Sequence, residues 1–210
     1  MVAEQYQQAP WISPAEYLRQ ERAASFKSEY VNGQIYAMAG ASPNHVRISL
    51  GVTNSLYNQL RGKGCEPFAQ DTRVRIPETS LYTYPDVLVA CPPLEYDDNL
   101  KDTLTNPVVI IEVLSPSTEA YDRGDKWAHY QRLTSLRDYV LVSQDRPRVE
   151  HYTRTSEGDW LFHIAEGLSA SITLSSVDCT LLLSDLYERL TFDTPPPRAP
   201  HLLPTPVPPS

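Results

Sequence analysis

The most constraining feature of the sequence is a glutamate in the middle of an otherwise apolar segment, VVIIEVL at residues 108–114. Such a segment is typical of a central strand that is covered on both faces. An ionised Glu112 in that position needs a cation, a hydrogen-bond donor or a metal, because burying an isolated carboxylate is costly. A second acid, Asp86, lies in the similar segment YPDVLVAC. If the two strands are neighbours, both acids meet at one end of a sheet and form one site.

The rest of the chain has the patterning of a mixed α/β (α+β) domain, with helices packed on a central mixed sheet. Asn32-Gly33 stands between two apolar alternations and predicts a type I′ hairpin. Helical periodicity and capping residues predict helices over about residues 14–24, 42–61, 122–135 and 184–190. Apolar runs predict strands over about residues 66–76, 84–91, 108–114, 138–143, 148–153 and 160–166, the last of them antiparallel.

These elements predict one domain over residues 13–192, preceded by a short extension, residues 1–12. A chain of 210 residues is long enough for one complete core. Residues 193–210 are rich in proline and cannot pack a core, so we expect an extended, disordered tail. Such a tail is either simply solvated or recognised by a proline-binding partner, and the sequence leaves both open.

The net charge of −8 bears on the partners of the chain. A protein that binds nucleic acid through phosphate contacts usually has a basic face. This chain is acidic as a whole, so such binding must rely on local cations, be weak, or leave some acids to bind metal. Tyr82, Tyr84 and Tyr121 are candidates for stacking on bases, although tyrosine-rich loops are common without that role.

Cysteine usage and apolar segments bear on location. The three cysteines, Cys65, Cys91 and Cys179, form no CxxC pair, so reduced thiols in a cytoplasm are the simplest interpretation. No apolar run is long enough to cross a membrane, and the first residues lack the basic start and apolar stretch of a signal peptide. We therefore expect a cytoplasmic protein without a membrane partner.

The helix expected over residues 122–135 supplies a cation for the site. Lys126, Tyr130 and Leu133 share one face of this helix. Because Leu133 belongs on the core side, Lys126 points toward the sheet, where it is an ion partner for Glu112. The alternative is that Lys126 runs along the edge of the helix and ends in water.

Asp86 and Glu112 are hard ligands that suit Mg²⁺ or Mn²⁺ with open water positions. Such a metal lowers the pKa of water and stabilises charge on a phosphate, while a nearby lysine orients the water or neutralises the transition state. The structural alternative is that Asp86 caps a turn after Pro85 and that Glu112 forms a salt bridge. The sheet-facing Lys126 favours the site.

Two sets of motifs carry a family resemblance. Pro85-Asp86 followed by Glu112-Val113-Leu114 resembles the PD-(D/E)XK nuclease signature. A larger set closely resembles the bacterial restriction endonuclease family of the Uma2 type, over about residues 13–155. Its segments, in order, are SEYVNGQIYAMAGASPNH, YPDVLVA, VIIEVLSPST, YDRGDKWAHY and RDYVLVS. This ordered set is far more specific than the PD dipeptide alone.

The resemblance implies a restriction-endonuclease-like fold and metal-dependent hydrolysis of phosphodiester bonds, with DNA as the expected substrate. It maps Asp86, Glu112 and the backbone carbonyl of Val113 onto the ligands of a Mg²⁺ or Mn²⁺ cofactor. The lysine expected two residues after the glutamate is Leu114 here, and Lys126 on the following helix matches the residue that takes its place. A homodimer is expected by analogy, because cutting two strands favours two sites.

Three further residues are secondary to this set. Glu29 matches an acid that precedes the hairpin of the family, and it would serve a second metal or the outer part of the site. His45 lies in the first turn of its helix, on the apolar stripe, where it either reaches the metal or phosphate or is an ordinary structural residue. Asp122 is interpreted mainly as an acid at the start of its helix.

Three functions remain open on the sequence alone. The first is a Mg²⁺-dependent endonuclease that cuts DNA. The second is a catalytically inactive module of the same fold that binds nucleic acid or a protein partner, for which the acidic balance and Leu114 argue. The third is a component of a mobile element or a defence system that acts only together with a partner.

Overall fold

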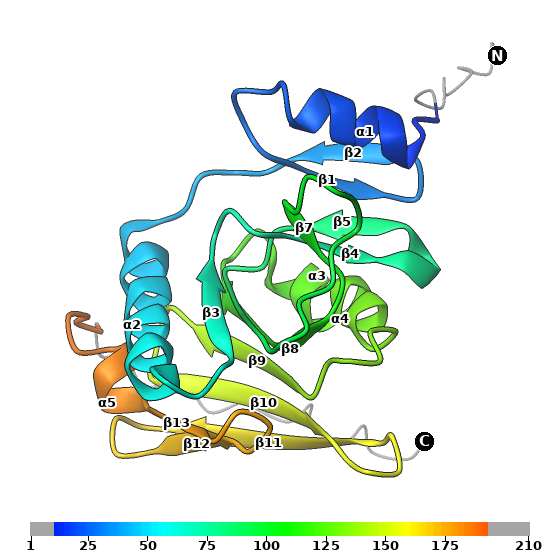
Figure 1. The fold of residues 1–210 in the computed structure, drawn as a ribbon. Helices are drawn as coiled ribbons and strands as arrows, with labels where there is room; N and C mark the ends of the chain where they lie inside the picture. Colours follow the sequence, from blue (N-terminus) through cyan, green and yellow to red (C-terminus); the bar gives the residue numbers. More distant parts are fainter. Residues whose placement is uncertain (1–10, 193–210) are drawn as a thin grey trace, which may run out of the picture.

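The computed structural model describes residues 11–192 of the chain. The proline-rich tail predicted over residues 193–210, and all but the last two residues of the predicted extension, lie outside the described residues. Within the described range, no helix has both the length and the apolar character needed to cross a membrane. Two larger β-sheets with helices packed against them form the mixed α/β architecture that the sequence predicts (Figure 1).

The smaller of these two sheets has the strand order β2-β1-β5-β4-β7 and carries helix α1 (Pro14–Glu21). Its strands are β1 (Ser28–Val31), β2 (Gln34–Ala37), β4 (Arg73–Ile76), β5 (Leu81–Thr83) and β7 (Thr103–Leu104), and the 3-10 helix η1 (Pro77–Thr79) joins β4 to β5. Asn32 and Gly33 have positive φ angles of 44° and 92°, as a type I′ turn requires, so the predicted hairpin is confirmed.

The larger sheet has the strand order β11-β10-β9-β8-β6-β3, and its pairs are antiparallel except for β8 with β9. Its strands are β3 (Glu66–Ala69), β6 (Val87–Ala90), β8 (Pro107–Leu114), β9 (Asp138–Ser143), β10 (Arg148–Arg154) and β11 (Trp160–Glu166). A separate hairpin of β12 (Ser171–Leu174) and β13 (Cys179–Leu182) was not predicted, because its four-residue strands are too short to show a clear periodicity.

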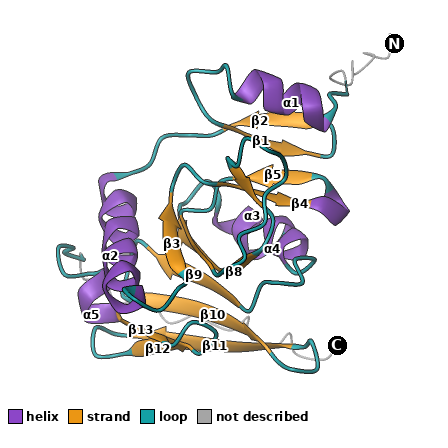
Figure 2. Cartoon of the chain, in the orientation of Figure 1, coloured by secondary structure: helices purple, strands orange, loops and turns teal. Residues whose placement is uncertain are grey.

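Alternate residues of the central strands face two apolar clusters, one on each side of the larger sheet. One face packs against α2 (Pro43–Leu60), α5 (Leu183–Leu186) and the β12–β13 hairpin (Figure 2). The other face packs against the smaller sheet and the segment that contains α3 (Glu119–Arg123) and α4 (Asp125–Tyr130). Cover on both faces explains the almost continuous apolar run of β8.

Two predicted elements are divided in the structure. Instead of the helix predicted over residues 122–135, the structure has two short helices, α3 and α4, that meet at Gly124, and α4 ends at Tyr130. A Cβ atom at Gly124 would lie 3.0 Å from the carbonyl oxygen of Ala120, so glycine permits the close approach at this junction. The predicted strand over residues 66–76 is β3 and β4, which join different sheets because the chain turns near Gln70, where φ is 53°.

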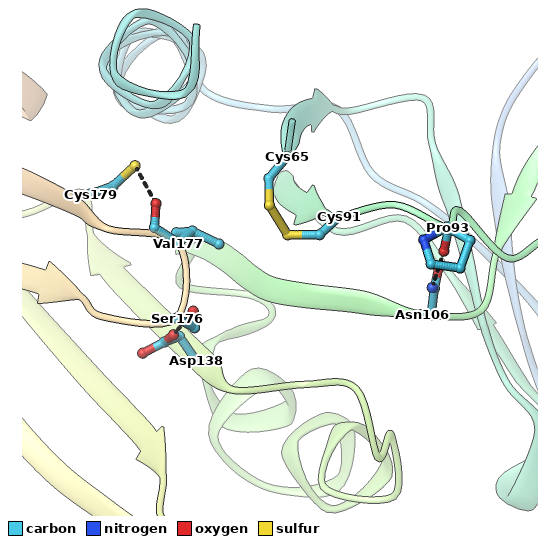
Figure 3. Close-up of a disulfide and its surroundings, with 8 residues drawn as sticks. All are labelled: Cys65, Cys91, Pro93, Asn106, Asp138, Ser176, Val177 and Cys179. Carbon is cyan, nitrogen blue, oxygen red and sulfur yellow. Dashed lines mark hydrogen bonds between the residues drawn. A yellow bond between two sulfur atoms is a disulfide. The ribbon is translucent and has the colours of Figure 1, made fainter. Parts of the chain in front are cut away.

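The expectation of reduced thiols is wrong for two of the cysteines. Cys65 and Cys91 form a disulfide, whereas Cys179 is a free, buried thiol (Figure 3). The cause is the register of β3 with β6, in which Glu66 pairs with Ala90. The next pair outward along this antiparallel ladder is Cys65 with Cys91, so their Cα atoms lie only 4.1 Å apart. Spacing in the sequence gave no indication of this contact.

Candidate active site

Asp86 and Glu112 lie side by side where β6 begins next to β8. The two strands are antiparallel neighbours, with Val87 opposite Ile111. The backbone N–H of Asp86 donates a hydrogen bond of 3.2 Å to Glu112 Oε2, and the N–H of Val113 donates one of 2.7 Å to Asp86 Oδ2. Each acid is thus bonded to the backbone of the other's segment, and the structure brings the two carboxylates together as the sequence analysis expected.

Glu112 is buried, and α4 supplies its two side-chain donors. The acid faces the same side of β8 as Ile110 and Leu114, toward the second apolar cluster. Lys126 Nζ lies 2.9 Å from Glu112 Oε1, and the Tyr130 hydroxyl donates a hydrogen bond of 2.8 Å to the same oxygen. Only 6% of Lys126 is exposed, so the alternative in which its side chain ends in water is wrong.

Two further carboxylates surround the Lys126 amine. Glu29 Oε1, from β1 of the smaller sheet, lies 3.3 Å from Lys126 Nζ, and Asp122 Oδ1, from α3, lies 3.6 Å from it. The Thr83 hydroxyl, from β5, donates a hydrogen bond to Glu29 Oε1. The amine therefore contacts carboxylates from the smaller sheet, the larger sheet and α3.

His45 contacts Asp86 from the start of α2. The Ser42 hydroxyl caps this helix by accepting a hydrogen bond of 3.1 Å from the His45 backbone N–H. The imidazole Nε2 lies 3.0 Å from Asp86 Oδ2. Burial lowers the pKa of His45, but the hydrogen bond to Asp86 and the charges of nearby carboxylates outweigh it and raise the pKa on balance. The structure thus brings His45 to the acids.

Negative charge exceeds positive charge in this cluster. Burial and the charges of neighbouring acids raise the pKa of Glu112 to about 8, although the Lys126 ammonium opposes the shift. Burial likewise raises the pKa of Asp122. Burial disfavours the charge of Lys126, yet the carboxylates around it hold its pKa well above the usual value. The amine therefore stays charged, and an additional cation would stabilise the ionised acids.

The oxygen ligands suit a divalent ion that keeps much of its water. Within residues 11–192, no group of three or more histidine, cysteine, aspartate or glutamate side chains is arranged to hold a metal ion by itself. Mg²⁺ is usually bound in proteins through one or two carboxylates and several waters. The adjacent carboxylates of Asp86 and Glu112, with the excess negative charge around them, fit that pattern.

The structure brings the candidate site residues from the sequence analysis into one cluster: Glu29, His45, Asp86, Glu112 and Lys126. Asp122 was expected at the start of a helix, but α3 begins at Glu119, so Asp122 lies near the end of α3 and contacts Lys126. Its position one turn before Lys126 was the signal for this contact.

Two other polar side chains of the cluster were not predicted from the sequence to belong to the site. Tyr130 shares a helical face with Lys126, and that spacing was the available signal for its bond to Glu112. Thr83 gave no signal, because its contact with Glu29 depends on the pairing of β1 with β5.

Two of the three tyrosines considered for base stacking are not available for it. Tyr82 and Tyr84 are buried, and their hydroxyls donate hydrogen bonds to Asp97 and Glu21. Tyr121 is only partly buried, and its ring centre lies 5.9 Å from the Lys126 amine.

Comparisons with known proteins find relatives over most of the chain. Residues 14–182 match the model of a family named Uma2 and described as "Putative restriction endonuclease". One uncharacterized protein of Synechocystis sp. is 40% identical over 183 residues, which cover 87% of this chain and 95% of the relative. A second from the same organism is 37% identical over 164 residues, which cover 78% of this chain and 93% of the relative.

One solved structure resembles this chain in three dimensions. It is titled as a "putative nuclease belonging to DUF820" from Anabaena variabilis, and it aligns with a TM-score of 0.69 and 19% sequence identity. The alignment covers 84% of this chain and 98% of that one. At this level of identity the likeness shows that the two proteins share a fold.

Proposed function

The chain belongs to the Uma2 family of restriction-endonuclease type, and we propose that it is a metal-dependent endonuclease that hydrolyses phosphodiester bonds of DNA. The observation that carries the proposal is the contact of the buried Lys126 amine with Glu112, 2.9 Å away, next to Asp86. The family description and the nuclease title of the structural neighbour also support it.

In this proposal Asp86, Glu112 and the backbone carbonyl of Val113 hold one Mg²⁺ or Mn²⁺ ion. When bound, such an ion supplies positive charge for a phosphate and lowers the pKa of water. The chain provides the two carboxylates from adjacent strand segments. Their bonds to the backbone amides of Asp86 and Val113 keep them oriented.

Lys126 provides the positive charge that the chain itself contributes. Since its pKa is well above the usual value, it keeps its proton at neutral pH and does not act as a general base. A fixed ammonium beside the acids would instead neutralise negative charge that develops on the scissile phosphate.

We assign positioning roles to the two secondary candidates. Glu29 holds the Lys126 amine from β1 through its contact of 3.3 Å. His45 orients the Asp86 carboxylate through its contact of 3.0 Å. In these roles neither side chain needs to touch the phosphate.

The alternative is a catalytically inactive module that binds nucleic acid or a protein. The net negative charge of the chain and Leu114, at the position where a lysine is expected, favour this alternative. The charged, buried Lys126 in contact with Glu112 favours the endonuclease. A homodimer with two cutting sites is a further part of the proposal, whereas the cytoplasmic location expected from the sequence is not. The Cys65–Cys91 disulfide argues against a reducing compartment, because structural disulfides are rare in the cytosol.

Cleavage assays with plasmid and single-stranded DNA in Mg²⁺, Mn²⁺ or EDTA test the proposal. The wild-type protein is expected to cut DNA only with the metal, and Asp86→Asn and Glu112→Gln are expected not to cut. Asp71→Asn is the matched control, because the Asp71 side chain is 87% exposed, and it should cut like the wild type. Cleavage in EDTA, or undiminished cleavage by both site variants, would contradict the mechanism.

A further inference from the structure

A cavity of about 510 Å³ opens beside the candidate site, between the β1–β2 hairpin and helices α3 and α4. Its volume lies in the range of small-molecule sites, roughly 300–1,000 Å³. The hairpin lines it with Glu29, Val31 and Tyr36, and the helices line it with Tyr121, Asp125 and His129.

The local structure explains why these side chains converge. Glu29 and Tyr36 are directly opposite each other in the β1–β2 ladder, so their side chains lie on one face of the hairpin. Asp125 and His129 are one turn apart on α4 and share a face of that helix. Glu29, which contacts Lys126, therefore also forms part of one wall of the cavity.

The walls combine aromatic rings with polar atoms that lack partners. Tyr36 is 56% exposed, so its ring is accessible from solvent. Tyr121 Oη and His129 Nδ1 are buried and have no hydrogen-bond partner within residues 11–192. Because unpaired buried polar atoms are costly, a ligand that bonds to them is favoured.

Lys126 connects this cavity to the paired acids. Its amine lies 2.9 Å from Glu112, 3.3 Å from Glu29 and 5.9 Å from the centre of the Tyr121 ring. Glu29 and Tyr121 both line the cavity. A phosphate near Lys126 would therefore have an attached nucleoside within reach of the cavity.

The charge of the cavity argues against a phosphate inside it. Glu29 and Asp125 would repel an anion, whereas carboxylates accept hydrogen bonds from the amino groups of bases. Aromatic side chains stack on bases of any sequence. A nucleobase matches both the rings and the acids of this cavity.

We propose that the cavity receives one unpaired nucleobase of the substrate, against the rings of Tyr36 and Tyr121 and adjacent to the scissile phosphate. This inference rests on the proposed endonuclease function and names its substrate class. A base inside a duplex is paired and stacked and cannot enter a pocket. The substrate is therefore single-stranded DNA, or a strand in which one base has turned out of the helix.

Binding experiments test the cavity separately from hydrolysis. The background is the full-length Glu112→Gln protein, in which the cavity lining is intact and cleavage is not expected. It is titrated in Mg²⁺ onto a labelled single strand and onto the same strand annealed to its complement. Addition of Tyr36→Ala is expected to weaken single-strand binding by roughly 5- to 150-fold, the range for one stacked base.

The matched control is Tyr57→Ala in the same background. Tyr57 is 58% exposed on α2 and does not line the cavity, so this change should leave single-strand affinity as it was. Duplex affinity should be weaker than single-strand affinity, because a base of the duplex must leave the stack before it can enter the cavity.

A second measurement replaces each nucleotide of the single strand in turn with an abasic one. One position is expected to lose about as much affinity as Tyr36→Ala causes, and the two losses should not add, because both remove the same contact. The proposal is overturned by equal affinity for every abasic strand, by duplex binding as tight as single-strand binding, or by no measurable single-strand binding.

These outcomes are distinguishable from failure of the endonuclease. If single-strand binding shows the abasic effect but the wild-type protein never cuts DNA, the base-binding cavity is supported and the proposed catalysis is contradicted. If the wild-type protein cuts DNA only with metal but no abasic effect is found, the proposed catalysis is supported and the base-binding cavity is contradicted.

Discussion

Lys126 Nζ lies 2.9 Å from Glu112 Oε1, although the two residues belong to different elements, α4 and β8. Leu114, two residues after the glutamate, faces the same side of β8 and packs in the apolar cluster there. In the nuclease signature that this sequence resembles, the lysine is expected at the position of Leu114. The placement of α4 therefore decides whether this site has its cation.

Replacement of Lys126 by methionine is expected to lower kcat by about 100-fold or more, while the affinity for Mn²⁺ changes much less. Methionine fills the buried space but removes the charge that stabilises the transition state, and loss of one such donor costs about 10²–10³ in rate. Cleavage kinetics and calorimetric titration with Mn²⁺ measure the two quantities. Lys63→Met, which removes an exposed lysine paired with Asp178, is the control. A wild-type rate in Lys126→Met would remove this residue from catalysis.

Mn²⁺ is expected to raise the Tm of the wild-type protein. A ligand present at 100 times its Kd stabilises the folded state by about 2.7 kcal/mol. Asp86→Asn and Glu112→Gln should lose most of this gain, because each removes one proposed carboxylate ligand. Scanning calorimetry with and without Mn²⁺ measures the effect, and the exposed variant Asp71→Asn should keep it. An equal gain in all of these proteins would place the ion elsewhere.

Lowering the pH is expected to remove the contribution of the Asp102 carboxylate to the free energy of unfolding. Arg22 donates two hydrogen bonds to its carboxylate, of 2.8 and 2.9 Å, and these bonds hold the pKa of Asp102 below its usual range although partial burial opposes the shift. Because the folded-state pKa is the lower one, the contribution is complete above the unfolded pKa of about 4 and is lost as the pH falls below it.

The variant Asp102→Asn isolates this effect. It should be less stable than the wild type at pH 7, by about 1 kcal/mol or less because the ion pair is partly exposed. The difference should shrink steadily as the pH is lowered below about 4. Urea unfolding at a series of pH values measures it, and a difference that stays constant down to pH 2 would show that the charge of Asp102 is not its source.

Reduction of the Cys65–Cys91 disulfide is expected to lower the free energy of unfolding by about 3.5 kcal/mol, the value for a loop of this size. The two cysteines are 26 residues apart, so the bond removes much freedom from the unfolded chain. Urea unfolding with and without a reductant measures the change. The double variant Cys65→Ser/Cys91→Ser should match the reduced wild type and respond to no reductant. A large effect of reductant on that variant would point to another cause.

The parts of the fold that could be predicted depend on local signals. Asn32-Gly33 forms the expected turn, and Ser42 caps α2 as its sequence context indicates. Glu112 could be placed in a buried strand because its neighbours are apolar on both sides. Lys126 could be placed toward the sheet because it shares a face of α4 with the buried Tyr130.

The parts that could not be predicted depend on how strands pair. The Cys65–Cys91 disulfide follows from the register of β3 with β6, and the bond from Thr83 to Glu29 follows from the pairing of β1 with β5. Neither register can be read from one strand alone. The cavity beside Lys126 is of the same kind, because a hairpin and two helices from distant parts of the sequence form it.

The Lys126 amine draws its partners from β1, β8 and α3, which belong to both sheets and to the helical segment. A folding intermediate with only one sheet in place would lack part of this cluster. Contacts between such distant segments form late, because the chain must first close long loops. On the proposed function, a newly made or damaged chain would be unable to cut DNA until its last tertiary contacts form.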